Sequence, residues 1–136
     1  MSLLRVEKLN KYFRLHHLGG KNIHGFSDLS FTIAPGEVLA LSGPSGTGKS
    51  SVLKCIYRTY LPSAGSIRYA SAHDGPLDLA ILPEHHIIKL RSQELGYVSQ
   101  FLSVLPRVTA ADIVAEPLIQ QGVPVEAANQ EAKHLL

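Results

Sequence analysis

Eight consecutive residues of this 136-residue chain have the types and spacing of a loop that binds phosphate. They occupy positions 43–50 and read Gly-Pro-Ser-Gly-Thr-Gly-Lys-Ser. The glycines let the backbone turn around an anion, so that successive N–H groups point inward. Lys49 can then reach the β- and γ-phosphates of a nucleotide, and the Ser50 hydroxyl can bind Mg²⁺. The residues expected to contact the nucleotide here are Gly43, Ser45, Gly46, Thr47, Gly48, Lys49, Ser50 and Ser51.

The segments on either side of this loop decide between a nucleotide site and an ordinary surface turn rich in Gly, Ser and Pro. The pattern G-x-x-x-x-G-K-[ST], known as Walker A, requires a buried strand before it and a helix after it. Residues 37–42 are mostly apolar and predict a short strand. Residues 51–60 predict a helix, with one apolar face made of Val52, Leu53, Ile56, Tyr57 and Tyr60. We therefore predict a true nucleoside-triphosphate site.

Composition limits the classes of protein to which the chain can belong. The net charge of +2 is too small to indicate direct binding of nucleic acid. No stretch approaches the length of a membrane span, and the N-terminus lacks the core of a signal peptide, so we expect a cytoplasmic protein. Cys55 has no cysteine partner and is expected to be a small packing residue. Charged residues are 18% of the chain, below the usual share, which suggests apolar surface that something outside the chain covers.

The rest of the chain divides into a strand-rich part and a helical part. Residues 11–27 are expected to form a loop that contains Gly19 and Gly20, and residues 87–93 one or two helical turns. The segments that predict strands are 3–9, 29–33, 66–70, 77–82 and 95–99.

A helix is expected to begin after Thr109, which is a good N-cap with Asp112 three residues later, and to run to about residue 121. Val108 and Ile113 stand where a hydrophobic staple would be. Gly122 and Pro124 then separate this helix from a second one. The second helix carries an apolar stripe that consists of Ala128, Ala132, Leu135 and Leu136.

Together these features resemble the ATP-binding cassette (ABC) ATPases, and the resemblance covers the whole chain. Pro35-Gly36-Glu37 leads into the loop strand, a Pro-x-x-Gly turn at 62–65 follows the helix, and Gln100 ends a later strand like the Q-loop of that family. The resemblance implies an α/β P-loop NTPase fold of ABC type. We expect a nucleotide-binding core at 1–100, with an N-terminal antiparallel β region, and the start of a helical subdomain at 101–136. The sheet is expected to be incomplete.

Within that family, the chain is most similar to the ATP-binding protein of the phosphonate carbon–phosphorus lyase system. The segments that carry this similarity are 57–62, 98–107, 116–119 and 122–124. The similarity implies an ATPase that couples ATP binding and hydrolysis to the lyase subunits. The alternative is an ATPase that docks on a membrane permease, of the phosphonate or lipoprotein type, at the inner membrane.

The resemblance also assigns roles to single residues. An aromatic residue after the first strand stacks on adenine in the family, and Phe13 fits by spacing, with Tyr12 as the second candidate. The alternative is that this aromatic only anchors the loop to the sheet. Gln100 is implied to touch Mg²⁺ or the attacking water. ATP and Mg²⁺ are therefore the expected cofactors.

Several parts that the family needs for hydrolysis have no match in these residues. They are the signature loop, the strand with the Mg²⁺-holding Asp and catalytic Glu, and the switch His. Asp112 and Glu116 lie on a predicted helix and do not replace them. We therefore expect the front part of a longer domain, with no catalytic residue, that binds ATP without turnover. The complete domain is expected to dimerise head to tail, whereas the isolated chain is expected to be unstable or to self-associate.

Other candidate sites and functions are weaker. The pairs His16-His17 and His85-His86 are neighbours that cannot face one metal, and we expect solvated loops there. Lys8, Lys11 and Arg14 are expected to lie at a solvated strand end, although one of them could approach the phosphates. A P-loop kinase or GTPase would need an Asp-x-x-Gly switch or an Asn-Lys-x-Asp base reader, and the sequence has neither. A binding or regulatory fragment without turnover is the remaining alternative.

Overall fold

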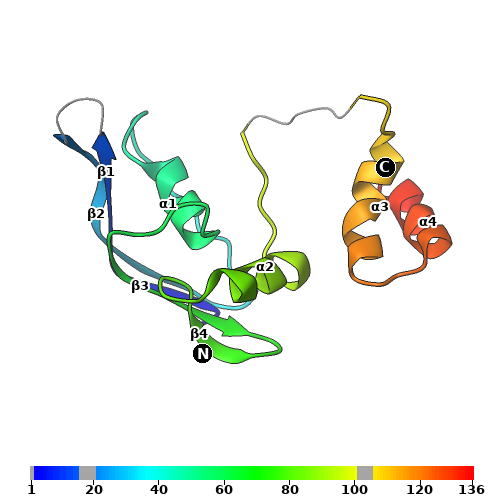
Figure 1. The fold of residues 1–136 in the computed structure, drawn as a ribbon, viewed down its shortest axis with the longest axis horizontal. Helices are drawn as coiled ribbons and strands as arrows, with labels where there is room; N and C mark the ends of the chain where they lie inside the picture. The colour runs from blue at the N-terminus through cyan, green and yellow to red at the C-terminus, as the bar shows by residue number, and fades with distance from the viewer. Residues whose placement is uncertain (1, 16–20, 101–105) are drawn as a thin grey trace. The chain divides into compact units, whose positions relative to one another are not determined.

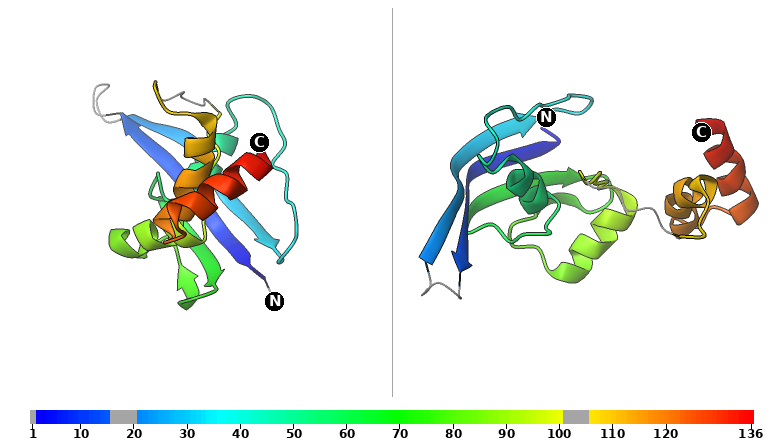
Figure 2. Two further views of the ribbon diagram at one scale, coloured as in Figure 1. Left: turned by 90° about the vertical axis from the view of Figure 1, so that its right-hand side faces the viewer. Right: turned by 90° about the horizontal axis from the view of Figure 1, so that it is seen from above.

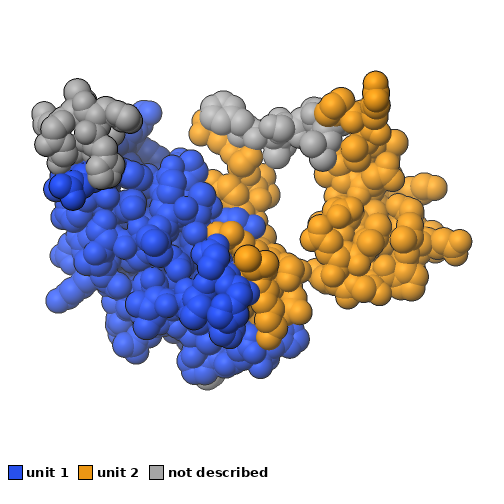
Figure 3. Space-filling view, viewed as in Figure 1, with its two compact units in different colours: residues 1–87 blue, residues 88–136 orange. Residues whose placement is uncertain are grey.

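The computed structural model describes residues 2–15, 21–100 and 106–136. Contacts between residues divide the chain into two compact units, residues 1–87 and residues 88–136 (Figure 3).

The first unit is built on an antiparallel sheet with the strand order β2-β1-β3-β4 (Figure 1). Its strands are β1 (Leu4–Leu15), β2 (Lys21–Ile33), β3 (Ala64–Ser71) and β4 (Gly75–Asp78). β1 lies between β2 and β3 and pairs with both, with Leu4 opposite Ile33 on one side and Tyr69 on the other. This arrangement confirms the expected antiparallel region at the N-terminus.

The first hairpin is much longer than its sequence indicates. Residues 11–15 and 21–27 were expected to form a loop, but they pair with each other as far as Leu15 and Lys21. The prediction was wrong because the polar residues and glycines hide a period-two pattern. The ladder of hydrogen bonds between the two strands holds these residues extended, and no single residue type reveals it. Three irregularities interrupt the pairing between Val6 and Tyr12. Lys8 (φ 46°) and Asp28 (φ 51°) lie in this region and have left-handed backbones, as in β-bulges.

One helix, α1 (Lys49–Ile56), lies on one face of this sheet (Figure 2). It buries Val52 and Cys55, whereas Leu53 remains 49% exposed, so the predicted apolar face is only partly buried. The helix also ends earlier than predicted, because Arg58 adopts a left-handed backbone (φ 64°) just after its C-cap. The buried apolar residues of the first unit are Leu4, Val6, Leu9, Phe26, Val52, Cys55, Ile67, Tyr69, Leu79 and Ile87.

Two predicted strands are not formed. Residues 37–42 and 95–99 take no part in a sheet, and Val38 and Val98 are 94% and 83% exposed. An apolar strand of a parallel sheet needs neighbouring strands, and the sheet of the described residues, β2-β1-β3-β4, includes neither segment. The predicted strand at 77–82 is also too long, since β4 ends at Asp78. Asp78 turns the chain there by accepting from the backbone N–H groups of Ile67 and Ala80.

Helix α2 (Glu84–Gln93) begins three residues before the predicted turns and continues across the boundary between the units. The second unit also contains α3 (Ala110–Gln120) and α4 (Val125–Leu135). The capping box predicted at Thr109 and Asp112 is confirmed, with both reciprocal hydrogen bonds present. Gly122 (φ 88°) ends the helix, as predicted. Its N–H donates to Ile119, and the next N–H donates to Leu118, as in a Schellman motif.

α3 and α4 pack through small residues. Ala115, Ala128 and Ala132 are fully buried, and partly buried side chains surround them. The predicted stripe on α4 is therefore only half right, because Leu135 and Leu136 remain 66% and 70% exposed.

Candidate functional site

The loop at 43–50 has the backbone that its glycines predict. Gly43, Gly46 and Gly48 have φ values of 149°, 83° and 87°, a region that side chains other than hydrogen disfavour. Thr47 donates its hydroxyl to the Pro44 carbonyl over 2.9 Å and so braces the bend from inside. The loop is thus folded back on itself, as an anion nest requires.

Lys49 closes this loop. Its ammonium donates to the carbonyl oxygens of Gly43 at 2.8 Å and Pro44 at 2.6 Å. The positive charge therefore lies against the first residues of the loop, where an entering phosphate would meet it. A phosphate must compete with these two carbonyl groups for the ammonium.

The start of α1 leaves backbone donors for an anion. Gly48 is the N-cap and supplies no side-chain cap, and the first turn contains no acidic residue. The first intrahelical bond runs from Val52 N–H to Gly48 C=O, so the amides of Lys49, Ser50 and Ser51 have no partner within the helix. These amides and the positive end of the helix dipole favour a negative group at this point.

The sheet fixes the position of the loop through a contact between two glycines. A Cβ atom on Gly48 would overlap the Gly25 carbonyl oxygen of β2 and would lie 3.4 Å from the Cβ of Phe26. Sequence reasoning missed Gly25, which it placed in a loop. A glycine in a strand is a signal of close backbone approach, so Gly25 could have been found had the strand been recognised.

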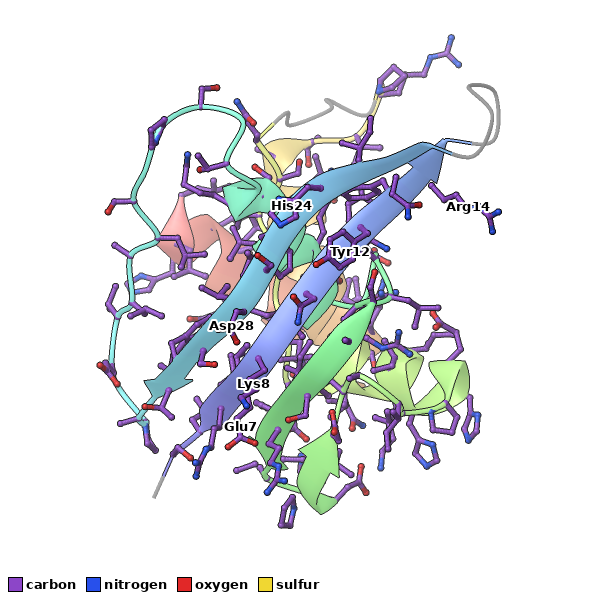
Figure 4. The ribbon with its side chains drawn as sticks, turned by 90° about the vertical axis from the view of Figure 1, so that its left-hand side faces the viewer. Glu7, Lys8, Tyr12, Arg14, His24 and Asp28 are labelled. Atoms are coloured by element: carbon purple, nitrogen blue, oxygen red, sulfur yellow. The ribbon has the colours of Figure 1, made fainter. Side chains whose placement is uncertain are left out.

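The two candidate stacking residues, Phe13 and Tyr12, point to opposite sides of the sheet, as neighbours on a strand must. Tyr12 is 44% exposed and meets His24 edge to face at 5.5 Å. Figure 4 shows this pair on the face turned away from α1. Phe13 is half-buried and contacts Tyr60, just after α1, at 5.4 Å. Of the two, only Phe13 is on the same side of the sheet as α1.

The remaining predicted residues have simpler surroundings. The side chains of Ser50 and Gln100 are exposed, and Gln100 lies in the second unit. Burial raises the pKa of the Cys55 thiol, and the charges of Lys11 and Arg58 lower it by less, so Cys55 is a buried packing residue as predicted.

The described part of the chain offers no metal cluster that would compete with the loop. Among the described residues, no three His, Cys, Asp or Glu side chains converge. His85 and His86 are exposed and stack on each other at 4.2 Å, whereas His16 and His17 lie outside the described residues. No described helix is long and apolar enough to cross a membrane.

A shallow depression of about 650 Å³ lies over β1, β2 and β3, where Arg5, Glu7 and Ser30 line it. Glu7 pairs with Arg5 at 2.8 Å and lies 3.6 Å from Arg68, so one carboxylate is shared by two guanidinium groups. The loop at 43–50 does not line this depression. The depression is therefore not part of the phosphate site.

Comparisons with known proteins agree with this geometry. Residues 26–136 match the family model described as ABC transporter. The chain belongs to this family. The chain is 38% identical over 118 residues to the lipoprotein-releasing system ATP-binding protein LolD of Koribacter versatilis, which covers 87% of the chain and 51% of the relative. It is 33% identical to the macrolide export ATP-binding/permease protein MacB of Aggregatibacter actinomycetemcomitans, over the whole chain and 20% of the relative.

A solved structure shows the same fold. The chain matches a dimeric post-hydrolysis state of the ATP-binding cassette MJ0796 bound to ADP and Pi with a TM-score of 0.79 and 23% identity, over 96% of the chain and 54% of the cassette. The fold is therefore that of an ABC ATPase, as predicted. This ABC chain spans about half the length of the LolD relative and of the MJ0796 cassette.

Proposed function

We propose that this ABC chain binds ATP with the phosphates in the loop at 43–51 and the base on Phe13. The observation that carries the proposal is the closed loop, in which three left-handed glycines and the Lys49 ammonium stand at an uncapped helix start. Oxygen groups suit Mg²⁺, and the exposed hydroxyl of Ser50 on the first turn of α1 fits that ion. Gln100 is the second proposed ligand. Bound Mg²⁺ would neutralise charge on the phosphates.

The system that this ATPase drives is proposed to be a membrane transporter. The relatives described above are named for lipoprotein release and macrolide export, which supports this function better than a role in phosphonate breakdown. The complete protein would then act in the cytoplasm, at the inner membrane, with a permease as its partner.

A second candidate is the ATPase of the phosphonate carbon–phosphorus lyase system. The segments 57–62 and 98–107 favour it, because their residues resemble that subfamily. None of the relatives named above is a phosphonate protein, so this candidate rests on the sequence alone.

We also propose that the complete domain works as a head-to-tail dimer that encloses two ATP molecules. The dimeric state of the MJ0796 cassette supports this. The present chain is proposed to bind ATP without turnover. The carboxylates of Asp112 and Glu116 on α3 already accept hydrogen bonds from Thr109 and Gln120, so neither is poised to orient a water.

The substitution Lys49→Ala tests the ATP site. Charge-assisted hydrogen bonds contribute about 1.5–3 kcal/mol, so the affinity for ATP measured by calorimetry should fall at least about tenfold. Lys133→Ala, on the exposed side of α4, is the matched control and should bind as the parent does. An unchanged affinity in Lys49→Ala would refute the assignment.

Purification of the complete protein with its natural partners separates the two systems. Integral membrane proteins in the complex support the transporter, and soluble lyase subunits support the second candidate. A complex that contains lyase subunits and no permease would overturn our preferred function.

A further inference from the structure

We propose that Tyr60 and Lys11 are positioning residues that hold the Phe13 ring for the nucleobase. This inference rests on the proposed function, because it concerns the base end of the same ATP site. The three side chains contact one another and come from β1 and from the segment that follows α1, the helix on one face of the sheet (Figure 2).

The Phe13 ring contacts both Lys11 and Tyr60. The Lys11 ammonium lies over the rings of Phe13 and Tyr60, at 5.0 and 5.8 Å from their centroids, and the two rings are 5.4 Å apart. These three distances form a nearly equilateral triangle. Tyr60 and Lys11 therefore approach Phe13 from similar directions, and the Phe13 side chain is only partly buried.

This arrangement is tied to the strand that carries Phe13. Lys11 donates to the Leu61 carbonyl over 2.8 Å, and the Ser63 N–H donates to the Asn10 carbonyl over 2.8 Å. The ammonium of Lys54, on α1, lies 5.2 Å from the Tyr60 ring, and the Tyr60 N–H donates to the Lys54 carbonyl. Tyr60 is thus held by both the helix and the strand.

The Phe13 ring is also close to the phosphate loop. A Cβ atom on Gly25 would lie 3.0 Å from Cε2 of Phe13, and the carbonyl of the same glycine touches Gly48. One residue of β2 therefore separates the ring from the loop. Because α1 begins at that loop and leads to Tyr60 at its other end, the helix fixes the distance between the base site and the phosphate site.

The test compares ATP with inorganic triphosphate, which has phosphates and no base. Calorimetry on the 136-residue chain measures both affinities for Tyr60→Leu and Lys11→Met. We expect the affinity for ATP to fall about 3- to 10-fold in each, because an aromatic or cation–ring contact contributes that much. The affinity for triphosphate should stay the same. Tyr60→Phe keeps the aromatic ring and should bind ATP with the affinity of the parent chain.

Several results would overturn the inference. Equal losses for ATP and triphosphate would mean that Tyr60 only supports the fold, and no loss for ATP would mean that it does not act on the base. Tyr12→Leu, on the other side of the sheet, is the control and should bind ATP normally. A loss there would place the base on Tyr12. If Tyr60→Leu does not fold, Lys11→Met decides the question alone. If the parent chain binds neither ligand, the proposed function itself fails.

Discussion

The contact between Gly48 and β2 makes a sharp prediction, because the chain contains a matched control. Gly46 and Gly48 have nearly equal φ values, 83° and 87°. A Cβ atom on Gly46 would meet nothing within 4 Å, whereas one on Gly48 would overlap the Gly25 carbonyl oxygen and lie 3.1 Å from the carbonyl carbon. The substitutions Gly46→Ala and Gly48→Ala therefore differ in this contact with β2 and in the place of Gly48 as the N-cap of α1.

The expected loss in the free energy of unfolding has two parts, the cost of the left-handed backbone and the cost of the overlap with β2. A left-handed backbone costs an alanine about 1–2 kcal/mol, and both variants incur this cost. Overpacking against a fixed backbone adds about 1–3 kcal/mol, and only Gly48→Ala incurs it. Urea unfolding followed by circular dichroism measures the difference. At a typical slope of about 1–3 kcal/mol per molar urea, the midpoint of Gly48→Ala should be roughly 1 M below that of Gly46→Ala.

The loop could instead relieve the overlap by moving away from β2. In that case the two midpoints would be close, and Gly48→Ala would lose affinity for ATP because the loop no longer encloses the phosphates. Equal midpoints together with equal ATP affinities would refute the role assigned to Gly25 and Gly48.

Three further predictions concern stability and reactivity. Arg58 is buried with a left-handed backbone and donates to the Leu82 carbonyl. Because glycine adopts that backbone more easily than alanine, Arg58→Gly should be more stable to urea than Arg58→Ala by about 1 kcal/mol. Equal midpoints for the two variants would argue against backbone strain at this position. Cys55 is buried with a raised pKa, so a thiol reagent at neutral pH should modify it only as the unit unfolds; rapid labelling of the folded chain would contradict this. Hydrogen bonds from Thr109 lower the pKa of Asp112 from its usual 3.8. A folded pKa below the unfolded value stabilises the fold at neutral pH, and this contribution should disappear as the pH falls below about 4. In Thr109→Ala this loss of stability at low pH should be absent, which unfolding measured at several pH values would show. An identical pH dependence in the two chains would count against the capping box.

The proposed roles of Phe13 and Gln100 differ in how far the structure supports them. Phe13 lies beside Gly25, which touches the phosphate loop, so a role at the base end has a geometric basis. Gln100 lies in the second unit, and its role remains a prediction from the resemblance.

The sequence by itself determined the features that depend on a few neighbouring residues. The bend at 43–50 needs glycines with left-handed backbones and a lysine that reaches back to close it, and all of these lie within eight positions. The same holds for the capping box at Thr109 and the turn at Gly122, where each hydrogen bond spans at most five residues. Local chemistry fixes such elements because the interacting groups are always close, whatever the rest of the chain does.

Only the tertiary structure decided the features that depend on partners far along the chain. Residues 11–15 became a strand because 21–27 pair with them, whereas the apolar segments 37–42 and 95–99 did not join the sheet. A strand is completed by hydrogen bonds to another segment, and its own residues cannot supply them. The same reason explains why the sequence did not reveal the roles of Gly25 and Tyr60. Their importance comes from what they touch, Gly48 and Phe13, and those contacts exist only after the sheet and the helix have packed together.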